Sequence, residues 1–338
     1  MDFSGLSADT AHRFRAVAEA LHSFAEDFPA EPRVLDVGGY PGTFARHFKA
    51  SYPRWKVTTL DRPEDNLPDY VHGTGAKIDF ADKSFDAVTS IDTLEHIPPA
   101  ERAAFLSELC RVSKSVVIVA APFHHPATAD VERLLDGLHR KIFNIPHPWL
   151  HEHVEHGLPD IHKTLAMLPK GYAVEDLQAS YDLQSWLVWQ ALSLYRKLEG
   201  EIDNAWLGFD KVFATAPTPE ITSVPYRYLI VARRGGRALN LSGGFTPEPD
   251  AGQEYVELAR LFCRMMEVLS GKVGGEVTAV LPTRLVDERL KEALKAAESE
   301  ILRLKARLDP HPPVASAAPE RESTGSFPQR ILRRFGKQ

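Results

Sequence analysis

Short apolar runs alternate with amphipathic helical patterns through the first 120 residues of the chain. This alternation predicts βαβ units and therefore an α/β fold built on a parallel sheet. A leading helix is expected over about residues 9–28, where apolar side chains recur on one helical face. Apolar runs near residues 172–179 and 226–232 would complete a doubly wound sheet of seven strands. The five strands expected before them lie at about 33–37, 56–60, 70–72, 85–90 and 115–120.

A glycine-rich turn follows the first predicted strand and reads D-V-G-G-Y-P-G from residue 36 to residue 42. Asp61 ends the next predicted strand about twenty residues later. Glycines let the backbone approach a ligand, and an acid at this place takes ribose hydroxyls, so the layout is typical of a nucleoside-containing cofactor. The spacing differs from the G-x-G-x-x-G of dinucleotide sites. An acid directly before the glycines suits a cofactor with an amino-acid tail better than one with a pyrophosphate.

Further motifs follow in order along the chain. S-F-D-A-V occupies residues 84–88 and D-T-L-E-H-I-P occupies residues 92–98, followed by an expected helix over 99–112 and an apolar strand over 115–121. Together with the glycine turn, these motifs resemble the class I S-adenosylmethionine (SAM)-dependent methyltransferases over roughly residues 30–122. The resemblance implies a Rossmann-like, mostly parallel sheet whose last two strands are antiparallel. It also implies SAM as the cofactor and methyl transfer as the activity.

The resemblance assigns cofactor-binding positions as well. Asp36 is expected near the amino-acid end of SAM, and Asp61 on the ribose. Tyr40 stands where the family has the middle glycine of its turn, and Thr74 stands where it often has an acid for the adenine amino group. The expected cofactor-binding residues are Asp36, Gly38, Gly39, Gly42, Asp61, Arg62, Thr74, Gly75, Asp92 and Leu94.

A long segment, residues 123–169, interrupts the predicted sheet after its fifth strand and carries eight of the fourteen histidines. It follows the carboxyl end of a strand, where ligands bind in open α/β sheets, so it is expected to form a helical cap over the substrate. Within it, H-P-W-L-H-E-H-V-E-H-G-L-P at residues 147–159 resembles a stretch of a bacterial methyltransferase subgroup often associated with glycan biosynthesis.

The candidate catalytic residues are His153, Glu152 and His96. His153 would take the proton of an acceptor hydroxyl, with Glu152 or Glu155 orienting the imidazole. Glu95 and His96 follow the fourth predicted strand, where they either take part in the chemistry or only brace the loop.

Two other interpretations of the histidines stay open. His151, His153 and His156 could bind a metal, because residues three apart share one face of a helix. Alternatively, these side chains cap helices and bond backbone groups in an irregular lid. We expect no metal ion, because a catalytic zinc site also needs well-placed outer carboxylates that a sequence does not reveal.

The acceptor is expected to be an oxygen on a saccharide or glycan intermediate. A small lipophilic metabolite is the second candidate. A methyltransferase-like scaffold with little or no catalysis is a third possibility. The aromatic stripe Trp186, Trp189 and Tyr195 is expected to pack in the core rather than against a sugar ring, since its spacing is helical.

The chain changes character after the predicted catalytic domain, residues 1–236. Residues 237–281 are expected to be a linker and a helix, residues 282–308 a short coiled coil, and residues 309–338 a disordered tail with a basic amphipathic end. The seam of the coiled coil would consist of Leu290, Leu294, Ala297, Ile301, Leu304 and Leu308.

Two kinds of contact are expected from this C-terminal part. The seam at 290–308 would pair with a second copy of the chain or with an enzyme of the same pathway, because an exposed apolar stripe needs a partner. The basic end would contact an anionic membrane surface through Arg330, Arg333, Arg334 and Lys337.

Composition narrows the setting. The formal net charge of −6 disfavours nucleic acid as a partner. The two cysteines, Cys110 and Cys263, lie far apart, which suits a reducing compartment. No apolar run approaches eighteen residues and no signal-peptide pattern opens the chain. We therefore expect a cytoplasmic protein, with the inner face of the membrane as a further location.

Overall fold

The computed structural model describes residues 2–3, 6–199, 224–237, 239 and 248–269. Seven strands form one sheet in the order β3-β2-β1-β4-β5-β7-β6. The first five are parallel, and β7 runs antiparallel to both β5 and β6. The predicted sheet is confirmed, including its antiparallel last pair. The strands are β1 (Arg33–Val37), β2 (Lys56–Asp61), β3 (Tyr70–His72), β4 (Phe85–Ile91), β5 (Ser113–Pro122), β6 (Tyr172–Asp182) and β7 (Pro225–Arg234).

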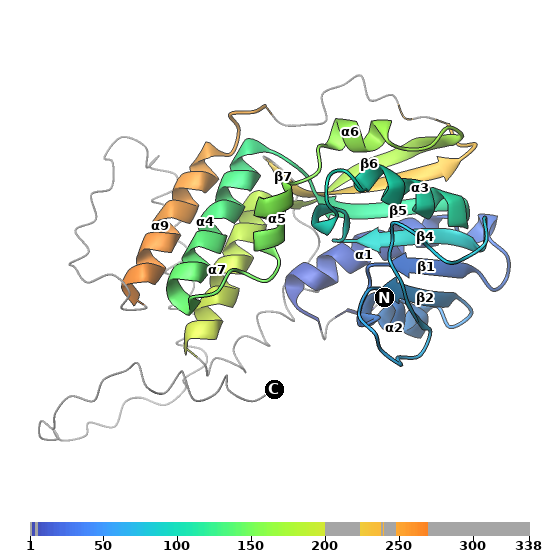
Figure 1. Ribbon diagram of the computed structural model, residues 1–338, viewed down its shortest axis with the longest axis horizontal. Coiled ribbons are helices and arrows are strands. Elements are labelled where there is room, and N and C mark those ends of the chain that lie inside the picture. The colour runs from blue at the N-terminus through green and yellow to red at the C-terminus, as the bar shows by residue number, and fades with distance from the viewer. Residues whose placement is uncertain (1, 4–5, 200–223, 238, 240–247, 270–338) are drawn as a thin grey trace, which may run out of the picture. The chain divides into compact units, whose positions relative to one another are not determined.

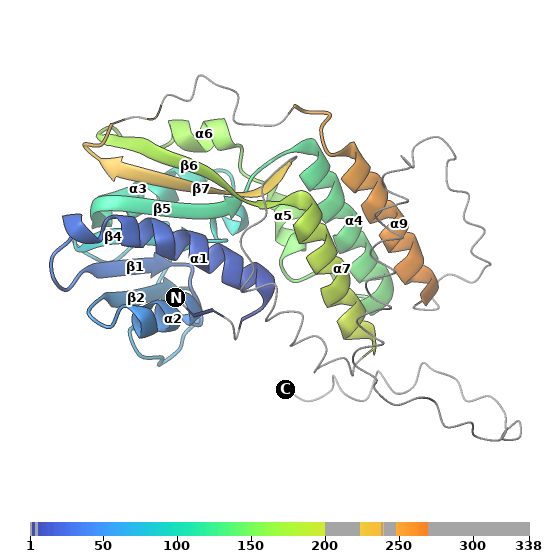
Figure 2. The same ribbon diagram turned by 180° about the vertical axis from the view of Figure 1, so that it is seen from behind.

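Helices cover both faces of the sheet (Figures 1 and 2). The helices α1 (Ala8–Ser23) and α2 (Thr43–Ser51) pack on one face, where Leu21 and Phe48 are fully buried. The helices α3 (Arg102–Val112) and α6 (Ile161–Ala166) pack on the other face. Because parallel strands between two helical layers are apolar on both sides, β4 is buried at every position. Two short 3₁₀ helices are η1 (Ala25–Asp27) and η2 (Leu94–His96).

Four more helices form a separate packed group at one end of the sheet (Figure 1). Trp186 lies in the centre of this group, where its ring stacks on Tyr226 with 4.1 Å between ring centroids. Trp189 is also buried, so the expectation that these two side chains pack in the core is confirmed; the side chain of Tyr195 lies outside the described residues. The helices are α4 (Pro126–Phe143), α5 (Leu150–His156), α7 (Leu183–Glu199) and α9 (Gln253–Leu269).

The predicted cap at residues 123–169 needs a correction. Only α4 and α5 from this segment join the helical group, and they are completed there by α7 and α9. The third helix of the segment, α6, packs on the sheet through Ile161 and Leu165. The helical group is therefore assembled from three separate parts of the chain, which the pattern within one contiguous segment does not predict.

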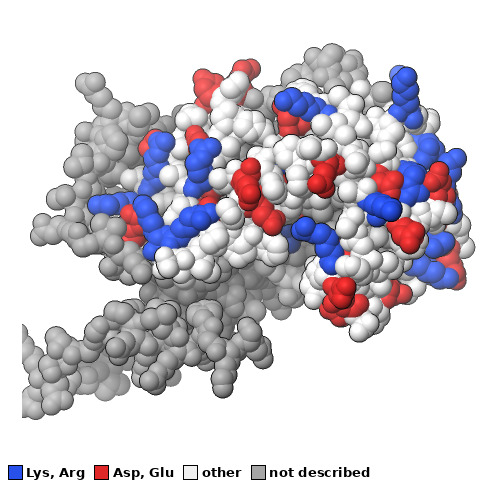
Figure 3. All heavy atoms as spheres, in the orientation of Figure 1, with Lys and Arg blue, Asp and Glu red and all other residues white. Residues whose placement is uncertain are grey.

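The expected domain boundary at residue 236 is also wrong. The apolar face of α9 is buried against α4 and α7 through Val256, Ala259 and Met266. Lys141 of α4 donates a hydrogen bond to Glu267 of α9 at 2.6 Å. Basic and acidic side chains are interspersed over the face of the molecule that Figure 3 shows. The first compact unit accordingly runs from Met1 to Gly275.

The expected coiled coil at 282–308 and tail at 309–338 lie outside the described residues. Among the helices that are described, none is both long and apolar enough to cross a membrane.

Candidate active site

The glycine turn after β1 leaves no room for side chains. Gly38 has a φ of 82°, and a Cβ atom there would lie 2.2 Å from Oγ1 of Thr93. A Cβ atom on Gly39 would lie 2.0 Å from Oδ2 of Asp36. Glycine is required at both positions because any larger residue would collide with its neighbours. Gly39 stands one position before the place where the family has its middle glycine, and the structure explains why this residue is glycine: it lies directly against the carboxylate of Asp36.

Asp36 is buried beneath the turn. Its Oδ1 accepts a hydrogen bond from Thr89 Oγ1 at 2.9 Å, while Oδ2 has no hydrogen-bond partner among the described residues. Burial raises the pKa of Asp36 to about 7, against the opposing effect of the Thr89 hydrogen bond. A buried carboxylate oxygen without a partner is costly, so a polar ligand group at this turn would relieve it.

Asp61 links the end of β2 to the same turn. Its Oδ2 accepts from the backbone N–H of Tyr40 at 3.0 Å, and its Oδ1 accepts from the backbone N–H of Arg62 at 2.7 Å. The Tyr40 ring lies edge-on to Tyr70, with 5.9 Å between centroids. The carboxylate expected on the ribose thus lies beside the glycine turn, as the sequence predicts.

The remaining expected cofactor residues fall around this edge with different surroundings. After β3, Thr74 is exposed and forms a β-bridge with Lys77, and a Cβ atom on Gly75 would lie 2.3 Å from the Phe105 ring. A cavity of about 360 Å³ lies on the α2 side of the turn and is lined in part by Gly42 and Tyr70. The side chain of Leu94 is fully buried in the sheet core, so only its backbone could face a ligand.

Asp92 has a different role from the expected one. Its carboxylate accepts two hydrogen bonds from Arg227, at 2.7 and 2.6 Å, and one from Arg13 at 2.5 Å. Burial alone would raise the pKa of Asp92, but the two guanidinium groups hold it well below its ordinary value. Asp92 therefore ties together β4, β7 and α1, and its side chain is already engaged.

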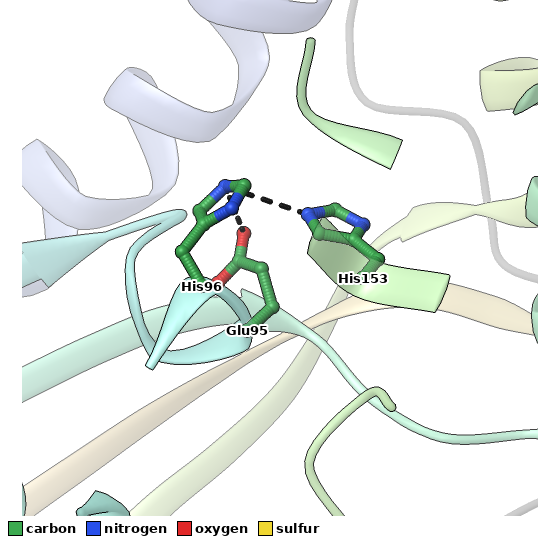
Figure 4. Close-up of side chains that lie close together, drawn as sticks. All are labelled: Glu95, His96 and His153. Atoms are coloured by element: carbon green, nitrogen blue, oxygen red, sulfur yellow. Dashed lines mark hydrogen bonds and ion pairs between the residues drawn. The ribbon is translucent and has the colours of Figure 1, made fainter. Parts of the chain in front are cut away.

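The three candidate catalytic residues are brought together at the end of β4. His96 Nδ1 donates to Glu152 Oε2 at 2.7 Å, and His153 Nδ1 donates to Glu132 Oε1 at 3.0 Å. The Nε2 atoms of the two histidines face each other at 3.4 Å, with Glu95 beside them (Figure 4). The helix α5 thus carries His153 and Glu152 to the loop that holds His96. The expectation that Glu152 or Glu155 orients His153 is wrong, because Glu152 pairs with His96 and Glu132 pairs with His153.

Burial and neighbouring charges shift the pKa values of His96 and His153 in opposite directions. Burial and the neighbouring His153 lower the pKa of His96 to about 4, against the effect of Glu152. Burial alone would lower the pKa of His153 too, but Glu132 and then Glu95 outweigh it and raise that pKa above its ordinary value. Burial and the charge of Asp92 raise the pKa of Glu95 to about 8. His96 is therefore the neutral member of the pair, and His153 holds a proton more readily.

The other histidines of the cap do not join this cluster. His151 Nδ1 accepts from Arg140 at 2.8 Å, and its ring also faces Glu155. Over the described part of the chain, the three donors close enough to share a metal ion are Glu95, His96 and His153, within 4.8 Å of one another. The trio His151, His153 and His156 is not brought together.

Sequence reasoning missed several residues that hold the cluster in place. Tyr226 donates to Glu132 at 2.8 Å, so β7 supports the carboxylate that faces His153. Arg102 donates to the backbone oxygen of Gly157 at 2.5 Å and fixes the end of α5 against α3. The one available signal was Glu132 itself, an acid at helical spacing within the apolar stripe of α4.

Comparison with known proteins finds a family match over the glycine turn and the loop after β4. Residues 10–136 match the family model described as a methyltransferase domain. This part of the chain is therefore similar to methyltransferase domains. The matched residues include β1 to β5 and the expected cofactor residues, whereas α5, with His153 and Glu152, follows after them.

Three curated proteins are similar to the chain over part of their length. An "uncharacterized methyltransferase" of Mycobacterium sp. (strain KMS) is 31% identical over 119 residues, which is 33% of this chain and 45% of the relative. The same figures hold for the proteins of strains JLS and MCS. The chain thus spans about half the length of the curated relatives it matches.

Two solved structures are similar to the chain at low identity. A candidate methyltransferase from Bacillus halodurans C-125 is 18% identical and covers 66% of this chain and 100% of its own, with a TM-score of 0.41. A candidate sarcosine dimethylglycine methyltransferase from Galdieria sulphuraria is 13% identical and covers 66% of this chain and 86% of its own, with a TM-score of 0.43. The sheet order, rather than these scores, establishes the fold.

Proposed function

We propose that the protein is a SAM-dependent methyltransferase that methylates an oxygen of a saccharide-like acceptor held beside His96 and His153. The observation that carries this proposal is that β4 brings two sites together. The glycine turn lies beside the start of the loop after β4, through the contact of Thr93 with the Val37 backbone oxygen at 3.3 Å. The same loop continues directly into the histidine cluster.

The residues at the turn fit SAM. The Gly38–Gly39 backbone is free of side chains, Asp36 offers an unpaired buried oxygen, and Asp61 keeps lone pairs beyond the two backbone bonds it accepts. Asp61 would hold the ribose, and the turn with Asp36 would hold the amino-acid end. When bound, SAM supplies a methyl group on a positively charged sulfur, which keeps the electron pair of the broken carbon–sulfur bond.

The histidine pair suits an acceptor hydroxyl. As its oxygen forms the new bond to carbon, the hydroxyl must lose its proton. The His96–His153 pair can receive that proton, and Glu132 then stabilises the imidazolium of His153. General base assistance of this kind contributes about 10²–10⁴-fold, while orientation of the two reactants contributes about 7–11 kcal/mol.

An aromatic surface supports a saccharide-like acceptor. The Trp149 side chain is 63% exposed, and its ring lies edge-on to His96 with 5.8 Å between centroids. An exposed aromatic ring beside convergent polar groups is typical of a ligand site. The face of a sugar ring could stack on Trp149 while one hydroxyl reaches the histidines.

The test is methyl transfer from isotopically labelled SAM to two acceptor panels, one of saccharides and one of lipophilic alcohols, with methyl ethers detected by mass spectrometry. A methyl ether on a saccharide, lost in His153→Gln but kept in the matched variant His156→Gln, is the expected result. Label appearing only on lipophilic acceptors would favour the second candidate substrate, and label on neither panel would contradict the proposal.

A further inference from the structure

The two imidazoles at the end of β4 are arranged like metal ligands. The Nε2 atoms of His96 and His153 are 3.4 Å apart. Two nitrogens bound to one ion at about 2.0–2.1 Å in a tetrahedral arrangement are roughly 3.3–3.4 Å apart. Glu95 Oε1 lies 4.0 Å from His96 Nε2, and all three donors lie within 4.8 Å of one another. The histidines already have the required separation, and Glu95 needs a side-chain shift of roughly 1 Å to complete the set.

Each histidine is held from behind by a carboxylate. Glu152 accepts from Nδ1 of His96, and Glu132 accepts from Nδ1 of His153. Tyr226 in turn donates to Glu132. This outer arrangement is the one that metal-binding histidines almost always show, because it fixes the tautomer and directs the Nε2 lone pair at the ion. A carboxylate behind both rings at once is hard to explain for a purely structural pair of histidines.

Glu95 supplies a second, independent observation. Its side chain is 1% exposed, and Oε2 has no hydrogen-bond partner among the described residues. The nearby guanidinium groups donate their hydrogen bonds elsewhere: Arg13 and Arg227 bond Asp92, and Arg102 bonds the backbone oxygens of Ile97 and Gly157. Burying a carboxylate in this state is costly, and a bound cation would remove the cost.

We propose that Glu95, His96 and His153 bind one divalent transition-metal ion of the zinc class. Two histidines with one carboxylate leave coordination positions open. The half-buried ring of His96 and the exposed Trp149 lie on the accessible side of the cluster. With the ion bound, the two Nε2 atoms are ligands and no longer receive a proton. An oxygen donor of the acceptor would occupy an open position, where the ion would favour loss of the hydroxyl proton to solvent. This use of the ion rests on the proposed methyl transfer, whereas the binding of the ion does not.

Calorimetric titration with Zn²⁺ tests the site in the full-length protein after chelation and dialysis, without SAM or acceptor. We expect one ion per chain in the wild type. Glu95→Gln and His153→Gln should abolish that binding, and Glu152→Gln should weaken it by about 10–100-fold because it removes an outer carboxylate. The matched control His156→Gln, on the same helix, should bind like the wild type.

Co²⁺ provides a second readout, since absorption bands of a four- or five-coordinate ion should appear in the wild type and in His156→Gln but not in Glu95→Gln or His153→Gln. Absence of 1:1 binding, or binding that survives Glu95→Gln and His153→Gln alike, overturns the proposal. If those two variants do not fold, the half-exposed Glu152 decides, because unchanged affinity in Glu152→Gln contradicts the arrangement. Titration of the same samples with S-adenosylhomocysteine separates a failure of the metal site from a failure of the proposed function.

Discussion

Replacing Asp92 with Asn should destabilise the protein by about 3–5 kcal/mol, because it removes the nearer counter-charge of a buried guanidinium and leaves only the longer contact with Asp9 at 3.4 Å. The side chain of Arg227 is only 2% exposed and donates two of the three hydrogen bonds that Asp92 accepts. Asn keeps one acceptor oxygen but turns an N–H₂ group toward a guanidinium. Arg13 is partly exposed and can turn to water, so Arg227 carries most of the cost.

The backbone makes Asp69→Asn a matched control. Asp92 and Asp69 both have a positive φ, of 47° and 55°, a conformation that Asn tolerates well, so neither change adds backbone strain. Asp69 pairs with Lys49 at the surface and is 54% exposed. A surface pair contributes about 0–1 kcal/mol, so the control should lose no more than that.

Urea unfolding of both variants at neutral pH measures the difference. Because the pKa of Asp92 lies below its ordinary value of 3.8, its contribution is complete above that pH and is lost as the pH falls below it. The gap between wild type and Asp92→Asn should therefore narrow in strong acid. An Asp92→Asn variant no less stable than Asp69→Asn would refute the reasoning.

Three further predictions follow from the packing and the cofactor turn. A truncated chain of residues 1–275 should melt like the full chain, whereas the free energy of unfolding of residues 1–236 should be several kcal/mol lower. The reason is that α9 buries four apolar side chains, each of which contributes about 1–3 kcal/mol. Equal melting temperatures of the two truncated chains would favour the boundary at residue 236. With a chelator present, the free energy of unfolding of the wild type should fall as the pH rises from about 4.5 to about 8, because the fold raises the pKa of Glu95 and so favours its protonated form. Glu95→Gln should show a smaller fall. Identical dependence of stability on pH in the two proteins would contradict the raised pKa. Gly39→Ala should abolish S-adenosylhomocysteine binding at the turn, because its Cβ would collide with Asp36. The control Gly137→Ala should bind normally, since a Cβ there meets nothing within 4 Å. Calorimetry of both variants checks this, and normal binding by Gly39→Ala would show that the turn tolerates a side chain.

The sheet could be predicted from the sequence because its strands are short apolar runs separated by helices, and burial at every position of β4 reflects that pattern directly. The meeting of His96 with His153 and Glu152 could be anticipated only as a general location at the carboxyl edge. Tyr226 lies 94 residues beyond Glu132, and Arg227 lies 135 residues beyond Asp92. Nothing local in the apolar strand that contains them distinguishes them as partners of these carboxylates.

The sequence pattern predicts α9 as part of a separate segment for a similar reason. An amphipathic helix has an apolar face whether it packs on its own domain, on a second copy or on another protein. Its partners, α4 and α7, come from distant parts of the chain, so the packing depends on the tertiary fold rather than on local pattern.

Calorimetric titration with S-adenosylhomocysteine tests the central claim most directly, in the wild type, in Asp61→Asn and in Asp65→Asn. Asp65 is a matched control because it lies in the loop after β2 and accepts a hydrogen bond from the exposed hydroxyl of Tyr40, away from the turn's backbone. We predict one site per chain, binding weakened by about 1.5–3 kcal/mol in Asp61→Asn through loss of a charge-assisted hydrogen bond, and unchanged binding in Asp65→Asn. No binding by the wild type, or equal binding by Asp61→Asn, would contradict the assignment of the glycine turn to SAM.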